Sequence, residues 1–101
     1  MRQAAMTRDE AEAIAYAGLA MLAAEPERIG RFFGLSGLDP AQIRELAPTP
    51  AFQTALLAHI MGDESLLLAF AANQGLDPAQ VGQAERLLSG QLPHLAGRAG
   101  S

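Results

Sequence analysis

The chain is 101 residues long, half of them apolar, and it carries a formal net charge of −4. That length allows one domain with one hydrophobic core, and the absence of cysteine excludes a disulfide framework and a thiolate zinc site. All seven basic residues are arginine, and an acidic chain without lysine is a poor match for a phosphate backbone.

The ends of the chain differ in composition from its middle. The N-terminal stretch has no apolar signal-peptide core and turns acidic early, so we expect residues 1–6 to be disordered and the protein to be cytoplasmic. No segment is long and apolar enough to predict a transmembrane helix. We expect a single helical domain over residues 7–90 and a loosely held tail over residues 91–101, in which Leu92 and Leu95 are candidates for docking.

A first helix is predicted from about Arg8 to Ala24. Thr7 and Glu10 form a T-x-x-E capping box, which satisfies backbone amides at a helix start. Gly18 lies on the apolar face of this helix, where glycine costs about 1 kcal/mol relative to alanine. A close crossing with another helix would explain its presence.

A second helix is predicted to start at Pro26, because the missing amide of proline is harmless in the first turn. It should end at Gly37, where glycine can adopt the left-handed conformation. On its outer face, Glu27 and Arg31 are one turn apart and can form an ion pair. Its apolar stripe consists of Ile29, Phe32 and Phe33.

Two further helix starts follow the same pattern of a capping residue and then a proline. Asp39 with Pro40 predicts a short third helix, which Pro48 should terminate. Thr49 with Pro50 predicts the start of a fourth helix. Its inner stripe consists of Phe52, Ala55, Leu56 and Ile60, widened by Leu57 and Met61.

The fifth predicted helix contains the most apolar stretch of the chain, because every residue of Leu66–Ala72 is apolar. A helix that is hydrophobic all round has no face to offer water. We therefore expect Leu66–Ala72 to be the most buried part of the fold. Asp63 and Glu64 are the only charged residues near it, at the turn that precedes it, so we expect the fourth and fifth helices to pack as an antiparallel hairpin that forms the core.

A sixth helix should begin at Asp77–Pro78 and end near Gly90. Together these elements predict an all-α fold, a compact bundle of five to six short helices around a central apolar helix. The segment GLDPAQI from Gly37 recurs as GLDPAQV from Gly75, so a two-fold internal repeat is possible. The alternative is that one effective junction, a glycine stop followed by an Asp-Pro start, occurs twice.

The segments RFFGLSGLDP and DESLLLAFA carry a resemblance to a known family. In this sequence they stand at residues 31–40 and 63–71, and the similarity extends over about residues 10–90. The chain resembles a small bacterial family of all-helical proteins, domain of unknown function 3572. The resemblance implies a compact helical protein in the bacterial cytoplasm. It implies no activity, and no catalytic residue follows from it.

The residues offer little for catalysis or metal binding. His59 and Asp63 are one turn apart and His94 is far along in the tail, and two ligands are too few for a closed metal site. The carboxylates cluster at helix starts, where capping accounts for them. There is no G-x-S-x-G, P-loop or dinucleotide motif. We expect no metal, no cofactor and no catalytic residues, and therefore not an enzyme.

Two helix–glycine turn–helix units raise the alternative of a DNA-binding helix-turn-helix regulator. In the first unit, Glu27 and Glu45 accompany the arginines, and in the second the charges amount to Glu85 and Arg86. This pattern disfavours a nucleic acid partner. The candidate contacts would be Arg28, Arg31 and Arg44 in the first unit, and Gln80, Gln83 and Arg86 in the second.

The sequence does not reveal a function, and the interpretation that it favours is a non-enzymatic helical protein acting through protein–protein interaction. A chain this small and apolar cannot hide every large side chain, and an exposed apolar patch marks a partner site. The candidate face is Phe32, Phe33 and Leu35, unless these residues complete the core. The partner could be a second copy of the chain or an unknown protein that packs helix-in-groove. We expect no membrane partner.

Overall fold

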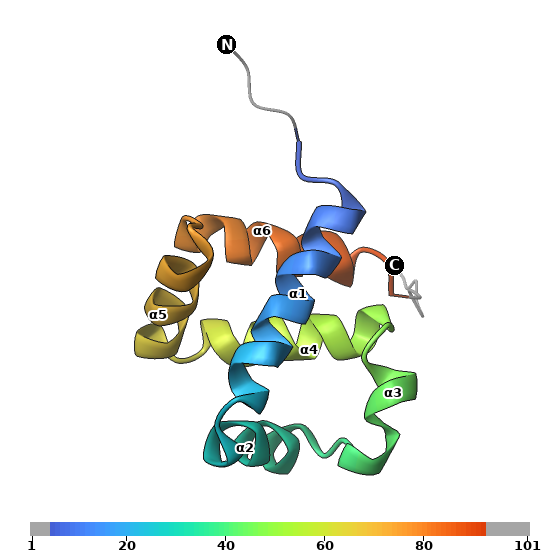
Figure 1. Ribbon diagram of the computed structural model, residues 1–101. Helices are drawn as coiled ribbons and strands as arrows, with labels where there is room; N and C mark the ends of the chain where they lie inside the picture. Colours follow the sequence, from blue (N-terminus) through green and yellow to red (C-terminus); the bar gives the residue numbers. More distant parts are fainter. Residues whose placement is uncertain (1–4, 93–101) are drawn as a thin grey trace.

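The computed structural model describes residues 5–92 and is built of helices joined by short turns (Figure 1). The predicted all-α fold class is confirmed. Residues 1–4 of the predicted disordered N-terminus and residues 93–101 of the predicted tail, including His94 and Leu95, lie outside the described residues. The helices are α1 (Arg8–Ala23), α2 (Pro26–Ser36), α3 (Ile43–Leu46), which follows a 3-10 turn (Pro40–Gln42), α4 (Pro50–Met61), α5 (Glu64–Gln74) and α6 (Pro78–Ser89).

Short-range hydrogen bonds define the helix starts. Thr7 accepts from the backbone amide of Glu10 at 3.1 Å, while the Glu10 carboxylate accepts from the amide of Thr7 at 2.9 Å, so the predicted capping box forms. Asp77 and Gln80 form a second box at the start of α6. The remaining side-chain caps are Asp39, Thr49 and Asp63, each of which accepts from an amide two or three residues ahead.

The two GLDPAQ segments share a junction but not a continuation. Gly37 and Gly75 both adopt the left-handed conformation, with φ of 74° and 66°, which only glycine adopts without strain. After Gly37 the chain forms a 3-10 turn and the single turn of α3, whereas after Gly75 it forms the 12-residue α6. The internal repeat is not confirmed.

The central helix is α4. It packs against α1, α2, α5 and α6, and its pairing with α6 is the most extensive in the fold. Figure 1 shows α4 and α6 running across the molecule with α1 laid over both. Leu56, Leu57 and Ile60 of α4 have no exposed surface at all. The core therefore lies where α1, α4 and α6 meet.

The prediction that Leu66–Ala72 is the most buried segment was wrong. Only Leu66, Phe70 and Ala71 are buried, and Leu68 is 50% exposed. The reason is the turn at Gly62, which bends α5 by 110° from α4 instead of returning it as an antiparallel hairpin. Helix α5 therefore lies at the side of the bundle, with one face against α1, α4 and α6 and the other uncovered.

The bend between α4 and α5 also bears on membrane insertion. Within residues 5–92, no single helix has the length and apolarity that a membrane span requires. Only α4 and α5 taken together have that length and apolarity, and the chain bends by 110° between these two helices.

Met6 and Leu92, near the two ends of the described chain, are both half-buried. Met6, inside the predicted disordered N-terminus, is half-buried against the core. At the other end Leu92 is half-buried, and its amide donates to the carbonyl of Ser89 at 3.1 Å. These contacts lie just outside the predicted domain limits of residues 7–90.

Gln53 is a polar residue inside the core. It is 1% exposed, and its Nε2 donates to the carbonyl of Ala47 at 3.0 Å. This bond ties the end of α3 to the first turn of α4. It offsets part of the cost of burying the amide, although the Gln53 Oε1 atom is also buried and accepts no hydrogen bond.

Gly18 marks a close crossing of α1 over α4. A Cβ atom at this position would lie 2.9 Å from the Ile60 Cδ1 atom and 3.6 Å from the Leu56 Cδ2 atom. The glycine is buried, so the approach of the two helices depends on its missing side chain. A helix-destabilising residue in the middle of α1 is thereby explained by packing.

We expect Gly18→Leu to lower the free energy of unfolding by roughly 1–3 kcal/mol, because a large side chain forces the packed helices apart. The matched control is Gly30→Ala in α2, where no atom lies within 4 Å of the new Cβ. That change should raise stability by up to about 1 kcal/mol through helix propensity. Urea unfolding of both variants measures the difference. Equal stability for Gly18→Leu and the wild type would contradict the close crossing.

Candidate partner-binding groove

The three residues predicted as a partner-binding face are not on one surface. Phe32 is 1% exposed and belongs to the core, Phe33 is half-buried, and Leu35 is 74% exposed. Phe32 is therefore inaccessible to a partner in this fold. A partner role for Phe33 and Leu35 stays a prediction.

Phe32 is held by aromatic contacts on several sides. Its ring centroid lies 5.4 Å from that of Phe33, 5.6 Å from that of Phe52 and 5.3 Å from that of His59, all in edge-to-face geometry. Such pairs contribute about 0.5–1.5 kcal/mol each beyond the apolar area that they bury. This cluster fixes α2 against α4.

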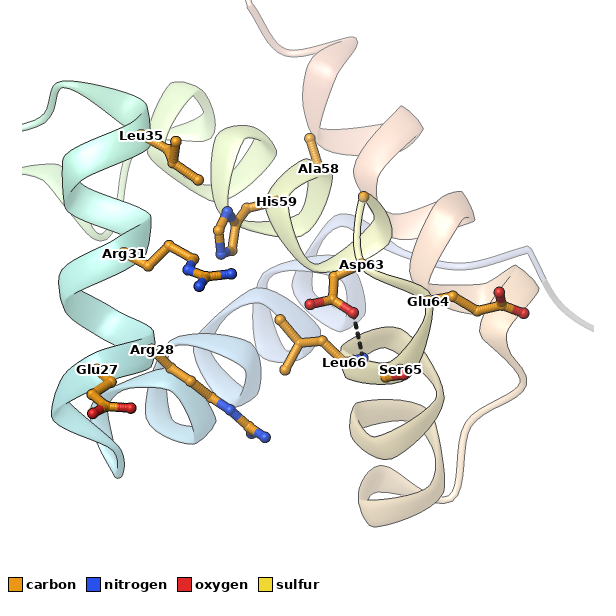
Figure 2. A pocket seen from close by; sticks show the side chains of 11 residues that line it. Glu27, Arg28, Arg31, Leu35, Ala58, His59, Asp63, Glu64, Ser65 and Leu66 are labelled. Atoms are coloured by element: carbon orange, nitrogen blue, oxygen red, sulfur yellow. Dashed lines mark hydrogen bonds between the residues drawn. The ribbon is translucent and has the colours of Figure 1, made fainter.

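Next to this cluster, a groove of about 800 Å³ opens between α2 and the corner where α4 meets α5 (Figure 2). Its size is in the range of ligand and peptide sites. Helix α2 forms one side, the last turn of α4 forms the floor, and the first turn of α5 forms the other side. The principal lining side chains are Arg28, Arg31 and Leu35 of α2, His59 of α4, and Asp63 and Leu66 at the start of α5.

The two sides of the groove differ in charge: the α2 side carries Glu27 together with Arg28 and Arg31, and the opposite side carries carboxylates alone. Arg28 and Arg31 lie on α2, and Figure 2 shows the Arg31 side chain reaching toward the imidazole of His59. Asp63 and Glu64 lie on the opposite side, where Asp63 accepts from the amide of Leu66 at 3.2 Å. Figure 2 shows the Asp63 carboxylate on the groove side of this corner and the Glu64 side chain pointing away from α2.

The predicted ion pair between Glu27 and Arg31 does not form. The salt bridges among residues 5–92 join Arg8 to Glu12 at 3.1 Å and Arg28 to Glu25 at 3.6 Å. An exposed pair on a helix contributes only a few tenths of a kcal/mol, so the absence of this one costs little stability. The Arg31 guanidinium instead lies at the groove.

His59 forms the polar part of the groove floor. Burial against Phe32 lowers the pKa of the imidazole from its ordinary 6.5, and the positive charge of Arg31 lowers it further. The carboxylate of Asp63 opposes both effects but is weaker. His59 is therefore neutral at pH 7 and can offer one hydrogen-bond donor and one acceptor.

This shift predicts a loss of stability in mild acid. The pKa of His59 is lower in the folded than in the unfolded chain, so the unfolded chain binds more protons once the pH falls below 6.5. The stabilisation by neutral His59 is complete above that pH and is lost as the pH falls toward the folded pKa. Urea unfolding across this window should show the decline, and His59→Gln should flatten it. An identical slope in both proteins would refute the assignment.

A second hollow of about 720 Å³ lies between the start of α1 and the start of α6. Its polar groups are engaged in capping: Glu10 accepts from Thr7, and Gln80 accepts from the amide of Asp77 at 2.8 Å. Asp77 in turn accepts from the amide of Ala79 at 3.1 Å. Gln83 also lines this hollow, but the capping bonds engage its carboxylates, so the groove beside His59 is the stronger candidate.

Local hydrogen bonds also occupy two of the serine hydroxyls. The hydroxyls of Ser36 and Ser89 donate to backbone carbonyls one turn back, at 3.4 and 3.1 Å. In the part of the chain from residue 5 to residue 92, no three histidine, aspartate or glutamate side chains gather in a way that could hold a metal ion. His59 and Asp63, the pair considered from the sequence, line the same groove.

Comparison with known proteins places the chain in a family. The model of the family described as "Protein of unknown function (DUF3572)" matches residues 8–91. The chain belongs to the DUF3572 family. This confirms the resemblance seen in the sequence, and the match includes all six α-helices and the whole groove. Neither the curated proteins nor the solved structures contain a match to this DUF3572 chain.

Proposed function

We propose that the protein acts by binding another polypeptide in the groove between α2 and the α4–α5 corner. The observation that carries this proposal is Leu35, a leucine 74% exposed on the side of an open groove. Single exposed leucines are common on protein surfaces. This one differs because it adjoins a concave site of about 800 Å³ with charged walls and a partly apolar floor.

Binding rather than catalysis is part of the same proposal. Five of the acidic and hydroxyl side chains that could act as acid, base or nucleophile serve as helix caps, namely Thr7, Asp39, Thr49, Asp63 and Asp77. The capping role of these side chains supports a function without a catalytic residue or a cofactor. The expected location in the bacterial cytoplasm also belongs to the proposal.

The test is photo-crosslinking in the cells that produce the protein. A photoreactive amino acid at Leu35 should capture a polypeptide, because a bound partner covers this side chain. The matched control is Ala41, which is exposed and lies outside the groove. Crosslinked polypeptide from position 35 but not from position 41 supports the proposal. No polypeptide adduct from position 35 overturns it.

The alternative function, a helix-turn-helix DNA-binding regulator, has less support. In the first unit the second helix is only the single turn of α3, too short to reach across a major groove. In the second unit, the start of α6 shares its hollow with Glu10 and Asp77, and these negative charges repel phosphate. Both observations weigh against a DNA partner.

We therefore expect no DNA binding at physiological salt. A gel shift with micromolar protein and mixed-sequence duplex should leave the DNA unretarded, because the net charge is −4. A basic helix-turn-helix protein serves as the positive control on the same duplex. Retardation that weakens as salt rises would favour the regulator.

A further inference from the structure

We propose that α2 is a pH-sensitive wall of the groove, which detaches from α4 in mild acid and thereby releases the polypeptide that the groove holds. The detachment is a property of the protein alone, whereas the release rests on the proposed function. The device consists of a helix with one deep anchor and a histidine, flanked by a positive charge, at the place where that anchor sits.

Helix α2 is held to the rest of the fold by few buried groups. Phe32 is the one buried residue among its 11, whereas α1 and α4 bury five residues each. Its principal packing partners are α1, which precedes it in the chain, and α4. Segments that bury few apolar side chains open locally at a lower free-energy cost than the core does. We therefore expect α2 to detach without unfolding of the helices that form the core.

The anchor of α2 rests on His59 of α4. The ring centroids of Phe32 and His59 are 5.3 Å apart in edge-to-face geometry, and the imidazole is half-buried. A positive charge on a ring that is partly withdrawn from water loses hydration. When α2 moves away, the imidazole regains that hydration. Proton binding by His59 therefore acts at the contact that fixes α2 against α4.

The charge of Arg31 adds to this effect. Its side chain reaches from α2 toward the imidazole in Figure 2, and it forms no salt bridge within residues 5–92. A protonated His59 would place two like charges across the contact between α2 and α4. Asp63 attracts the imidazolium from the α4–α5 turn, but it acts on His59 less than Arg31 does. Its carboxylate also accepts from the amide of Leu66.

The other charged groups that line the groove are Glu27, Arg28 and Glu64. Arg28 is paired with Glu25 at 3.6 Å, and the Glu64 side chain points away from α2. Glu27 lies in the first turn of α2. The charges that act on the pKa of His59 are Arg31 and Asp63. Protonation of His59 therefore meets a net unfavourable environment as long as α2 is in place.

The direction of the pH effect follows from these contacts. The pKa of His59 is lowered in the folded chain and returns toward its ordinary value of 6.5 when α2 leaves, so acid favours the detached form. The attachment is complete above that pH and weakens as the pH falls toward the folded pKa. Histidine is the only side chain whose ordinary pKa lies between about 5 and 8, and the other histidine of the chain is His94.

Hydrogen exchange of the full chain, followed by mass spectrometry, tests the detachment. It is measured at about pH 7.5 and about pH 5.5, on either side of the ordinary histidine pKa, with times scaled for the chemical exchange rate. The amides of α2 should exchange several-fold faster at the lower pH, while those of α4 and α6 keep their protection. Equal protection of α2 at both pH values overturns the proposal. So does an equal acceleration in α2, α4 and α6, which would mean global opening.

Three variants assign the effect to its groups. His59→Gln should remove the acceleration of α2, and Arg31→Gln, at an exposed position, should reduce it. The matched control is His94→Gln, which should leave the acceleration as it is in the wild type. Circular dichroism checks that each variant folds, and Arg31→Gln carries the test if His59→Gln does not. Undiminished acceleration in a folded His59→Gln or Arg31→Gln refutes the proposal, as does its loss in His94→Gln.

Crosslinking from position 35 separates the release from the proposed function. In cells whose interior is acidified with a permeant weak acid, the adduct should be lost, and His59→Gln in the same chain should retain it. An adduct of equal yield at both pH values refutes the release and retains polypeptide binding. The absence of an adduct at either pH refutes polypeptide binding itself, and hydrogen exchange then still decides whether α2 detaches.

Discussion

Phe70→Ala is expected to lower the free energy of unfolding by about 3–5 kcal/mol, as truncation of a buried phenylalanine does. Phe70 has no exposed surface, and its Cζ atom lies 3.7 Å from the point where a Cβ at Gly18 would stand. Its ring therefore fills the space where α5 meets α1. A small domain has about 5–15 kcal/mol in total, so the variant should be partly unfolded at room temperature. Thermal melts should show a fall in Tm of at least about 12 °C.

The matched control is Leu68→Ala, two residues earlier on the same helix. Leu68 is 50% exposed, so the loss should be less than about 1 kcal/mol. Both substitutions replace a large apolar residue by alanine in α5, and helix propensity changes little in either. Equal losses would mean that α5 is buried on both faces, against the arrangement in this structure.

Phe32→Ala should have an effect of similar size, about 3–5 kcal/mol. The substitution removes the ring that joins Phe33, Phe52 and His59, and with it the main contact between α2 and α4. It also removes one of the side chains packed against His59, and burial is the main cause that lowers the pKa of His59, so that pKa should rise toward 6.5. Urea unfolding measures the first effect, and an NMR titration of the imidazole measures the second.

Leu35→Ala provides the control for Phe32→Ala on the same helix. With its side chain 74% exposed, Leu35 contributes little to the core, and unfolding should change by less than about 0.5 kcal/mol. Association through the groove should nevertheless weaken. If Phe32→Ala left both stability and the His59 titration unchanged, the placement of Phe32 in the core would be wrong.

The helix boundaries could be predicted because the interactions that set them are local. Asp63 caps Leu66, and Asp77 caps Ala79, within two or three residues. Gly37 and Gly75 end their helices through their own backbone conformation. None of these features requires knowledge of the tertiary fold. Capping residues and helix-ending glycines can therefore be recognised from the sequence alone.

The choice of central helix could not be predicted, because it depends on neighbours that are distant in sequence. Helices α4 and α5 are both strongly apolar with no clear polar face, so composition does not distinguish them. Their positions follow from the 110° bend and from the way α1 and α6 enclose α4. Nothing within the run Leu66–Ala72 encodes that geometry.

The candidate site was predicted only in part, for a similar reason. Phe32 and Phe33 are adjacent and chemically identical, and only their angular positions on a packed α2 separate core from surface. Leu35, one of the three predicted candidates, is exposed, and its role as a partner contact stays a prediction. The groove combines α2 with the α4–α5 corner, and residues about 30 positions apart meet there, so it had no signal in the linear pattern.

The uncharged run Leu66–Ala72 also determines how the chain behaves after it unfolds. In the folded state its backbone is hydrogen-bonded within α5, and half of it is covered by neighbouring helices. Once α5 detaches, the chain presents a stretch of seven apolar residues without charge or proline, which promotes apolar association between chains. Asp63 and Glu64 before it and Asp77 after it are the nearest charges that oppose such contacts. Heated at high concentration, the protein should therefore aggregate instead of refolding, and its thermal transition should depend on the scan rate.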